Sequence, residues 1–567
     1  MKDVFRKSGR RGWIVVTGVV ILLSFGFLAF DASQDFKYAK SLDIFFSLFR
    51  ELNIYYVDET DPEKLVKKGI DEMLQSLDPY TTFIPESELD EFAFMTTGQY
   101  GGIGSLVRKS GDYVVISETY KAFPADKAGL KPGDIILEVD GKSTKGLPIT
   151  SVSEKLKGQP NSQVELLIER FGIDKPFKKL VTREKIQISS VPYYGMLDNE
   201  TGYIRISNFT QNSAREAKEA FQKLKENNHV QSLIIDLRSN PGGLLIEAVD
   251  LVNLFVEKNQ EIVSTRGKIK QWDNTYTARF EPLDTKIPLV VLVNRASASA
   301  SEIVAGALQD LDRAVIVGQR TFGKGLVQTT RQLSYNTKLK VTTAKYYVPS
   351  GRCIQALDYA HRNEDGSVGY IPDSLISAYK TKNGRTVYDG GGIQPDIEVP
   401  MDSVAEITLQ LYTSFRIFDF ATRFAATYPE IPAPGSFSLS DSQYDMFVEF
   451  VRSQEFRYET ATEDAFNTLV EKAEKEKYYQ LARNEFENLK KKIMPDLHKD
   501  LYAFKPEIIN LLEQEIAGRY FYEAGSIEVS LRNDTSLKSA MKVIKDKKQY
   551  SAILSETVQG EKLGLNK

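Results

Sequence analysis

The chain has 567 residues, which is too long for a single ordinary domain and indicates about three or four units at roughly 150 residues each. Hydrophobic residues make up 42% of the chain and charged residues 26%, a balance that is typical of globular proteins and excludes a largely disordered one. The net charge of -4 argues against a nucleic-acid partner, because phosphate binding needs a concentrated basic surface.

Cysteine and histidine are scarce. The single Cys353 cannot form an internal disulfide and cannot build a metal site alone. His229, His361 and His498 lie in polar, charged stretches, as expected of surface side chains. We therefore expect no metal centre, no cofactor and no histidine-based catalytic triad.

The amino terminus carries a basic flank and then an apolar run. The run from Trp13 to Phe30 has no charge and would span roughly 27 Å as a helix at about 1.5 Å per residue. By the positive-inside rule the basic flank stays in the cytoplasm and the rest of the chain is exported. Residues 1–35 are therefore predicted to be a cytoplasmic flank and a transmembrane anchor in the inner membrane. The alternative is a cleaved signal peptide.

Two further regions precede the long α/β part of the chain. Residues 36–91 have apolar positions at helical spacing and predict an N-terminal helical region, with two helices separated by YYVDETDPEK. Residues 92–186 change to short alternating runs, such as YVVISET and QVELLIER, between turn signals. This second pattern predicts a small β domain.

Two glycine-containing segments stand out in the small β domain. Gly101-Gly102-Ile103-Gly104 precedes one strand, and the sequence AGLKPGD, from Ala128 to Asp134, precedes the next. A glycine loop bares successive backbone N–H groups, which suit the terminal carboxylate of a peptide, while the adjoining strand edge can pair with that peptide. The two segments resemble those of PDZ domains. The resemblance implies that Gly101, Gly102, Ile103 and Gly104 bind the carboxyl terminus of a substrate.

Residues 187–400 alternate strand and helix patterns. VQSLIIDLRSN precedes GGLLIEAVDLVNLFV, and IPLVVLVNR precedes SEIVAGALQDL. Their nearly continuous apolar strands predict βα units and a layered α/β core. Beyond Pro400 the pattern is mainly helical, so residues 401–567 are predicted to form a helical C-terminal domain.

A serine repeat lies at one strand-to-helix turn of this core. A hydroxyl placed there is exposed at the sheet edge, and an oxyanion forming on its substrate would meet the unpaired N–H groups of the helix start. Ser301, followed by Glu302, is expected to belong to the N-cap of the helix. Ser297 or Ser299 then remains for nucleophilic chemistry, although helix capping alone would also explain such a repeat.

A serine nucleophile needs a base, and the glycine-rich segment from Gly318 to Gln328 contains Lys324. A lysine can serve as the base where an apolar setting lowers its pKa toward neutrality, and Phe322, Leu326 and Val327 are its apolar neighbours in the chain. Gln328 could orient the amine. Without the serine, a surface lysine in a glycine turn would explain the same residues.

Together, these segments resemble the C-terminal processing peptidases, also called tail-specific or carboxy-terminal proteases. The family motifs appear as SASASEI at 297–303, FGKG at 322–325 and DLRSNPGG at 236–243. Shorter family landmarks, LDPYT, GYIRIS, YYVPSGR and GGGIQPDIEV, begin at Leu77, Gly202, Tyr346 and Gly390. The resemblance covers about residues 36–400 and leaves the helical tail unexplained.

The resemblance implies an α/β fold with a ClpP/crotonase-like layered protease core and an inserted PDZ domain. It implies a serine endopeptidase that cleaves exported proteins near or from their C-terminal tails through an acyl-enzyme, without metal or cofactor. The implied site residues are the nucleophile Ser299, the general base Lys324, its partner Gln328, oxyanion donors on Gly242 or Gly243 and on Ala300, and Arg170 as a link between PDZ domain and core.

The expected partners are protein or peptide substrates with free C-terminal tails and the membrane that holds the N-terminal helix. The catalytic part is expected in the periplasm or elsewhere outside the cytoplasm, and a homo-oligomer or an adaptor protein stays open. The alternative function is a non-catalytic, PDZ-containing binding or scaffold protein of the cell envelope.

Overall fold

A computed structural model describes residues 36–555 and divides the chain into two compact units, one ending at Phe83 and one beginning at Ile84. The first unit contains a helix over residues 36–55 and α2 (Pro62–Gln75), which match the two predicted helices. Asp61 caps α2 by accepting hydrogen bonds from the N–H groups of Glu63 and Lys64. Within residues 36–555, no helix is both long and apolar enough to cross a membrane, and the predicted anchor lies outside the described residues.

The second unit begins with η1 (Glu86–Glu88) and α3 (Leu89–Thr97) and continues into the small β domain. Its main sheet has the order β3-β4-β5-β7-β8, with β6 beside β5. The strands are β3 (Ser105–Ser110), β4 (Tyr113–Thr119), β5 (Ile135–Val139), β6 (Lys142–Ser143), β7 (Gln163–Glu169) and β8 (Phe177–Thr182). The helices α4 (Pro124–Lys127) and α5 (Ile149–Leu156) complete the domain, and β2 (Gln99–Gly102) pairs with β9 (Glu184–Gln187). In this sheet, β3 is an edge strand.

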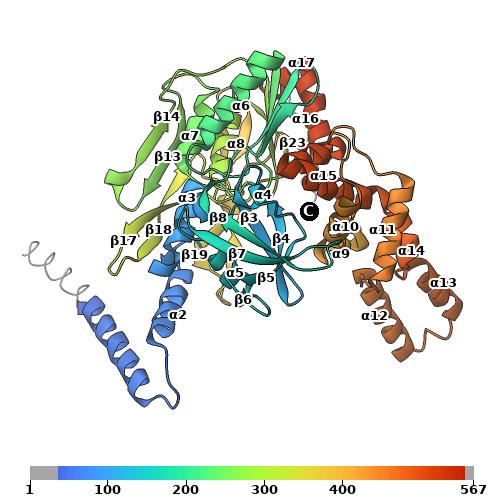
Figure 1. The fold of residues 1–567 in the computed structure, drawn as a ribbon. Helices are drawn as coiled ribbons and strands as arrows, with labels where there is room; N and C mark the ends of the chain where they lie inside the picture. Colours follow the sequence, from blue (N-terminus) through green and yellow to red (C-terminus); the bar gives the residue numbers. More distant parts are fainter. Residues whose placement is uncertain (1–35, 556–567) are drawn as a thin grey trace, which may run out of the picture. The chain divides into compact units, whose positions relative to one another are not determined.

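The α/β core is built on a sheet with the order β10-β11-β12-β15-β16-β23, parallel from β11 onward. Figure 1 labels its edge strand β23. Its strands are β10 (Tyr193–Met196), β11 (Thr201–Arg205), β12 (Ser232–Asp236), β15 (Leu289–Val293), β16 (Val315–Gly318) and β23 (Ile397–Glu398). Every residue of β12 and β15 is buried, because the sheet is covered on both faces. Their burial agrees with the layered α/β core that the continuous apolar runs predict.

Alternate residues of these strands point to different layers. Leu233, Ile235 and Val291 pack with helices α6 (Ser213–Asn228), α7 (Leu245–Asn253) and α8 (Ala300–Asp310). Ile234, Val290 and Leu292 pack instead with α16 (Thr535–Lys545), near the end of the described chain. The second face of this sheet is thus covered by a helix that follows every strand of the sheet in sequence.

A second sheet and two hairpins extend the core. The sheet contains β13 (Glu261–Gly267), β14 (Asn274–Thr277), β17 (Leu326–Gln332) and β18 (Lys338–Tyr347), and β18 pairs with both β13 and β17. The hairpins are β19 (Leu357–Arg362) with β20 (Val368–Tyr370), and β21 (Ala378–Lys380) with β22 (Thr386–Tyr388). The predicted lysine segment leads directly into β17.

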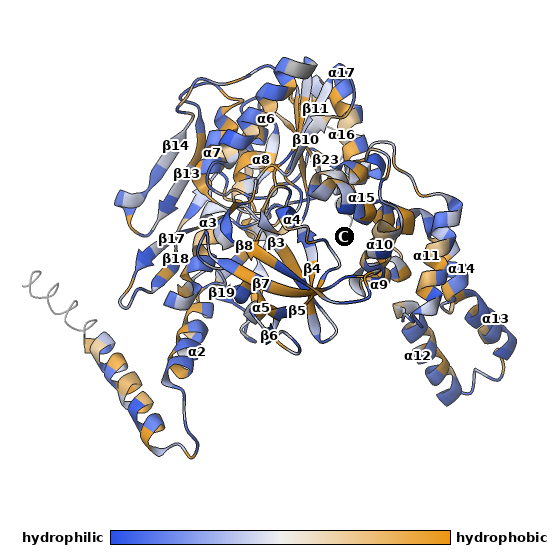
Figure 2. Cartoon of the chain, in the orientation of Figure 1, coloured by the Kyte–Doolittle hydropathy of each residue, from blue (hydrophilic) through white to orange (hydrophobic). Residues whose placement is uncertain are grey.

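The C-terminal region is mainly helical, as predicted. Its helices are α9 (Glu406–Thr413), α10 (Arg416–Thr427), α11 (Asp441–Ser453), α12 (Ala461–Lys475), α13 (Arg483–Ile493), α14 (Leu497–Ala503), α15 (Lys505–Ser530), α16 and α17 (Lys547–Ile553). An aromatic cluster holds α10 to α11, with Phe420 5.2 Å from Phe447 and 5.8 Å from Phe450 between ring centroids. Figure 2 shows α13 as largely hydrophilic, consistent with a helix that has no buried residue.

The helical region also contacts the PDZ-like domain. The guanidinium of Arg108, on β3, lies 3.8 Å and 4.0 Å from the ring centroids of Phe415 and Phe418. The Tyr522 hydroxyl donates to Asp126 at 2.8 Å. Tyr522 itself has φ +59° and interrupts α15, so this contact coincides with a break in the longest described helix.

Candidate active site

The serine turn joins β15 to α8. Helix α8 begins at Ala300, and Ser299 is its N-cap with φ +56° and ψ −113°. A serine rarely adopts positive φ, and such backbone strain persists only where the surroundings impose it. The expectation that Ser301 belongs to the N-cap is wrong: Glu302 stands three residues after Ser299, and its carboxylate accepts the Ser299 N–H at 2.8 Å.

The three serines of the repeat have different surroundings. Ser297 Oγ donates to the Leu237 carbonyl at 2.8 Å and accepts the Asn294 N–H at 2.9 Å. Ser301 Oγ donates to the Asn240 carbonyl at 3.0 Å, and both side chains are fully buried. Ser297 and Ser301 therefore bind the turn to the loop after β12. Ser299, the predicted nucleophile, is the half-buried member of the three.

The loop after β12 carries the two predicted oxyanion glycines. A Cβ on Gly242, which has φ +101°, would lie 2.8 Å from Ser299 Cβ and 2.9 Å from the Ala300 nitrogen, so only glycine fits there. The Gly242 N–H donates to Asn240 Oδ1 at 2.9 Å. Among residues 36–555, neither the Gly243 N–H nor the Ala300 N–H donates a hydrogen bond to another residue. Gly243 and Ala300 are thus the better placed of the three predicted donors.

The predicted base lies on the neighbouring segment. Lys324 is half-buried, Leu326 is buried and Val327 is partly buried against the core. Phe322, the third expected apolar neighbour of the lysine, is 48% exposed. Its N–H donates to the Ser297 carbonyl at 3.0 Å. Gln328 Nε2 donates to Thr342 Oγ1 at 3.1 Å, across from β17 to β18.

A buried carboxylate connects the serine turn to the lysine segment. Glu302 is fully buried, and its Oε2 accepts the N–H groups of Ser299 and Lys324, both at 2.8 Å. Its Oε1 accepts the Gly323 N–H at 2.7 Å and the Thr321 hydroxyl at 2.6 Å. Burial raises the pKa of Glu302, and the four donors act against that rise. Sequence reasoning gave this residue only a capping role.

A tyrosine makes the same connection from β18. The Tyr346 hydroxyl lies 3.0 Å from the Ser299 carbonyl oxygen and 2.6 Å from the Lys324 carbonyl oxygen. Tyr346 is 1% exposed and begins one of the family landmarks found in the sequence. The backbones that carry the predicted nucleophile and base are therefore fixed to one another by two buried side chains.

The three histidines lie elsewhere. His361 Nδ1 pairs with Asp358 at 2.8 Å on β19, and the His498 ring lies 5.1 Å from that of Tyr502 in the helical region. His229 is exposed at the end of α6. Among residues 36–555, no three histidine, cysteine or carboxylate side chains form a group that could hold a metal ion.

Of the predicted carboxylate-binding residues, Gly101 and Gly102 lie at the end of β2, and Ile103 and Gly104 connect β2 to β3. A Cβ on Gly101 would lie 2.2 Å from the Gly158 carbonyl oxygen, and Gly104 has φ +73° with Phe123 Cβ 2.5 Å from its own Cβ position. The carbonyls of Ile103 and Gly104 accept the N–H groups of Ala125 and Tyr120. Burial raises the pKa of Tyr100 to about 12, and the N–H groups of Gly104 and Ser105 oppose the rise.

Arg170, predicted to link the PDZ domain to the core, makes its hydrogen bonds within its own domain. Its Nε and Nη2 donate to the two carboxylate oxygens of Asp134 at 2.6 Å and 2.7 Å, and Nη2 also donates to the Gly129 carbonyl. These partners belong to the AGLKPGD segment, and the Asp134 side chain is 1% exposed. The nearest buried carboxylate therefore holds Arg170 inside its own domain.

Three family models match the chain. "Peptidase family S41" matches residues 200–360, "PDZ domain" matches residues 115–170, and "Probable PDZ-protease, C-terminal helical domain" matches residues 407–544. The third match covers the helical tail that the sequence resemblance left unexplained. It also joins the tail to proteins that combine a PDZ domain with a protease.

Two similar sequences agree with the S41 match. The carboxy-terminal-processing protease of Bartonella bacilliformis is 36% identical over 340 residues, which are 59% of this chain and 75% of the relative. A Staphylococcus aureus "Probable CtpA-like serine protease" is 34% identical over 346 residues, 60% of this chain and 68% of that one. Among solved structures, the photosystem II D1 C-terminal processing protease is 30% identical, with a TM-score of 0.34, over 63% of this chain and 92% of that one.

A layered α/β core with a PDZ domain and a serine at a strained helix start defines a serine peptidase. The chain belongs to the carboxy-terminal-processing proteases of peptidase family S41.

The network around Glu302 generates a prediction. Glu302→Gln replaces one acceptor oxygen by an NH₂ group that faces two existing donors. We expect it to lower the free energy of unfolding by about 1–3 kcal/mol and to slow fluorophosphonate labelling of Ser299 by about tenfold or more. Labelling rates and urea unfolding measure the two effects.

Glu247→Gln is the matched control. Glu247 accepts hydrogen bonds from the N–H groups of Asn212 and Ala214 at the start of α6. The change therefore replaces a carboxylate that accepts backbone N–H groups, as Glu302→Gln does, in another part of the core. It should lower stability without slowing the labelling. Equal labelling rates in the two variants would contradict the role given to Glu302.

Proposed function

We propose that this peptidase hydrolyses peptide bonds with Ser299 as nucleophile and Lys324 as general base. Lys324 takes the Ser299 proton as the hydroxyl attacks the scissile carbonyl, and the lysine then protonates the leaving amine. The amine departs and leaves an acyl-enzyme on Ser299. A water molecule, deprotonated by the same lysine, releases the second product and restores the serine.

One observation carries the proposal. The other two serines of the turn are buried and donate hydrogen bonds to carbonyl groups. Ser299 is half-buried at the start of α8, and it lies next to Gly242, where a side chain would not fit. The N–H groups of Ala300 and Gly243 would hold the oxyanion, aided by the positive end of the α8 dipole. Glu302 and Tyr346 keep the lysine segment at a fixed distance from this turn.

Substitution of the dyad tests the mechanism. Ser299→Ala should abolish both peptide hydrolysis and fluorophosphonate labelling, whereas Ser297→Ala and Ser301→Ala should remain labelled. Lys324→Arg should be as inactive as Lys324→Ala, because a guanidinium stays protonated and cannot accept the serine proton. Replacing all three histidines by Gln should leave turnover within about twofold, since none of them takes part in the chemistry. Hydrolysis of a fluorogenic peptide measures each variant. An active Lys324→Arg enzyme would refute the dyad.

The PDZ domain is proposed to select substrates by a free C-terminal tail. The edge strand β3 can pair with an extended peptide, and residues 101–104, which run from β2 toward β3, lead into that strand. Backbone N–H groups of this segment would bind the terminal carboxylate. This recognition would bring tails of exported proteins to the protease core.

Amidation of the substrate terminus tests tail selection. It removes the negative charge, and loss of charge-assisted hydrogen bonds should lower kcat/KM by about tenfold. Gly104→Ala should abolish the preference for the free acid by deforming the loop. Gly111→Ala, which also replaces a glycine at positive φ but meets no neighbouring atom, is the matched control and should keep the preference. Equal cleavage of acid and amide by the unmodified enzyme would exclude tail selection.

We further propose that the N-terminal apolar run anchors the enzyme in the inner membrane, with the peptidase outside the cytoplasm. The basic flank before Trp13 supports this orientation. An alkaline phosphatase fused after residue 40 should be active, because that enzyme requires export. An inactive fusion together with an active cytoplasmic reporter at the same position would reverse the topology.

A further inference from the structure

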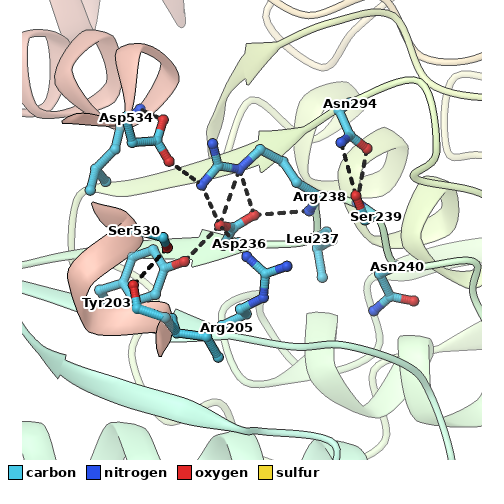
Figure 3. A network of polar contacts seen from close by, with 12 residues as sticks. Tyr203, Arg205, Asp236, Leu237, Arg238, Ser239, Asn240, Asn294, Ser530 and Asp534 are labelled. Atoms are coloured by element: carbon cyan, nitrogen blue, oxygen red, sulfur yellow. Dashed lines mark hydrogen bonds and ion pairs between the residues drawn. The ribbon is translucent and has the colours of Figure 1, made fainter. Parts of the chain in front are cut away.

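Arg238 connects the protease core to the C-terminal helical domain (Figure 3). Its Nη2 lies 2.6 Å from Asp236 Oδ2 and 2.6 Å from Asp534 Oδ2, and its Nε lies 3.0 Å from Asp236 Oδ1. The side chains of Arg238 and Asp534 are 16% and 13% exposed. An ion pair so shielded from water is screened less than a surface pair. Burial acts to lower the pKa of Arg238, but the two carboxylates together raise it.

Asp236 is the buried end of this network. It is the last residue of β12, is fully buried, and accepts the Tyr203 hydroxyl at 2.6 Å. Burial acts to raise the pKa of Asp236, but Arg238 and Arg205 hold it below its usual value. Asp236 therefore stays ionised and fixes one side of the Arg238 guanidinium. The Asp534 carboxylate fixes a second side of the same guanidinium.

Asp534 has two separate tasks. It is the N-cap of α16, and its Oδ1 accepts the Leu537 N–H at 2.8 Å, while Oδ2 faces Arg238. The apolar side of α16 packs through Leu537, Ala540 and Val543 on the second face of the protease sheet. Docking of α16 on the sheet therefore determines where the Asp534 carboxylate lies.

The loop that follows Arg238 leads directly to the active site. The Ser239 N–H donates to Asn294 Oδ1 at 2.8 Å, which ties the loop to the serine turn. The Asn240 carbonyl accepts the Ala298 N–H and the Ser301 hydroxyl, both at 3.0 Å. Two residues later, Gly242 lies against Ser299. A displacement of Arg238 would thus be passed to the glycines through a short, hydrogen-bonded chain.

We infer that Asp534 is a positioning residue of the active site: by pairing with Arg238 it holds the loop from Asp236 to Gly243 in place against Ser299. The inference rests on the proposed function, in which Gly243 on this loop supplies an oxyanion donor. It makes efficient acylation of Ser299 dependent on α16, a helix that contributes no residue to the site. The helical domain then acts on the chemical step as well as on stability.

The test separates the charge of Asp534 from its capping role. Asparagine caps a helix about as well as aspartate, so Asp534→Asn keeps the helix start and removes the ion pair. With a short chromogenic peptide, we expect kcat to fall by about tenfold and KM to stay within about twofold, because only the fixed position of the oxyanion donors is lost. Asp534→Glu keeps the charge and should recover part of kcat.

Asp546→Asn is the matched control. Asp546 caps α17 by accepting the N–H groups of Lys548 and Gln549. The control should keep the unmodified enzyme's kcat. The inference is overturned if Asp534→Asn keeps full kcat, or if kcat falls equally in both Asn variants.

Failure of the proposed function would look different. In that case fluorophosphonate would not label Ser299 in the unmodified enzyme, whatever the behaviour of Asp534→Asn. Labelling of Ser299 at the same rate in the unmodified enzyme and in Asp534→Asn would leave the proposed nucleophile intact and refute the positioning role alone.

Discussion

The arrangement of the candidate site depends on one buried carboxylate, that of Glu302. Its two oxygens accept four hydrogen bonds, from Ser299, Thr321, Gly323 and Lys324, so two loops that are separate in the chain share one acceptor group. Burying a carboxylate is costly unless such donors surround it. This arrangement of the two loops is therefore favoured over others, because a displacement of either loop would leave a buried polar group unpaired.

The same principle extends outward from Glu302. Asn240 uses its side-chain oxygen for Gly242, its side-chain nitrogen for the Ile206 carbonyl and its own carbonyl for the serine turn. Asp236 and Arg238 then join that loop to the helical region. Strands and buried polar groups thus hold the candidate residues in place, an arrangement that preorganised electrostatic catalysis would require.

Much of this could be predicted from short segments of sequence. Alternating apolar runs predicted the PDZ-like sheet, continuous runs predicted β12 and β15, and the serine and lysine motifs identified Ser299 and Lys324 as candidates. Contacts between distant segments were not predictable. The residues next to Glu302 in sequence do not indicate its hydrogen bonds to Gly323 and Lys324. The charge of Arg170 does not indicate that Asp134 is its partner. The amphipathic pattern of α16 does not indicate which sheet the helix covers.

The position of α16 in the chain has a consequence for biosynthesis. Ribosomes make the strands of the protease sheet first, and Val290, Leu292 and Val315 lose contact with water on the second face only when α16 has been added. Until then the nascent peptidase has an open apolar surface and lacks the partner of Arg238. The candidate site therefore gains the contact between Arg238 and Asp534 only when nearly the whole chain has been synthesised.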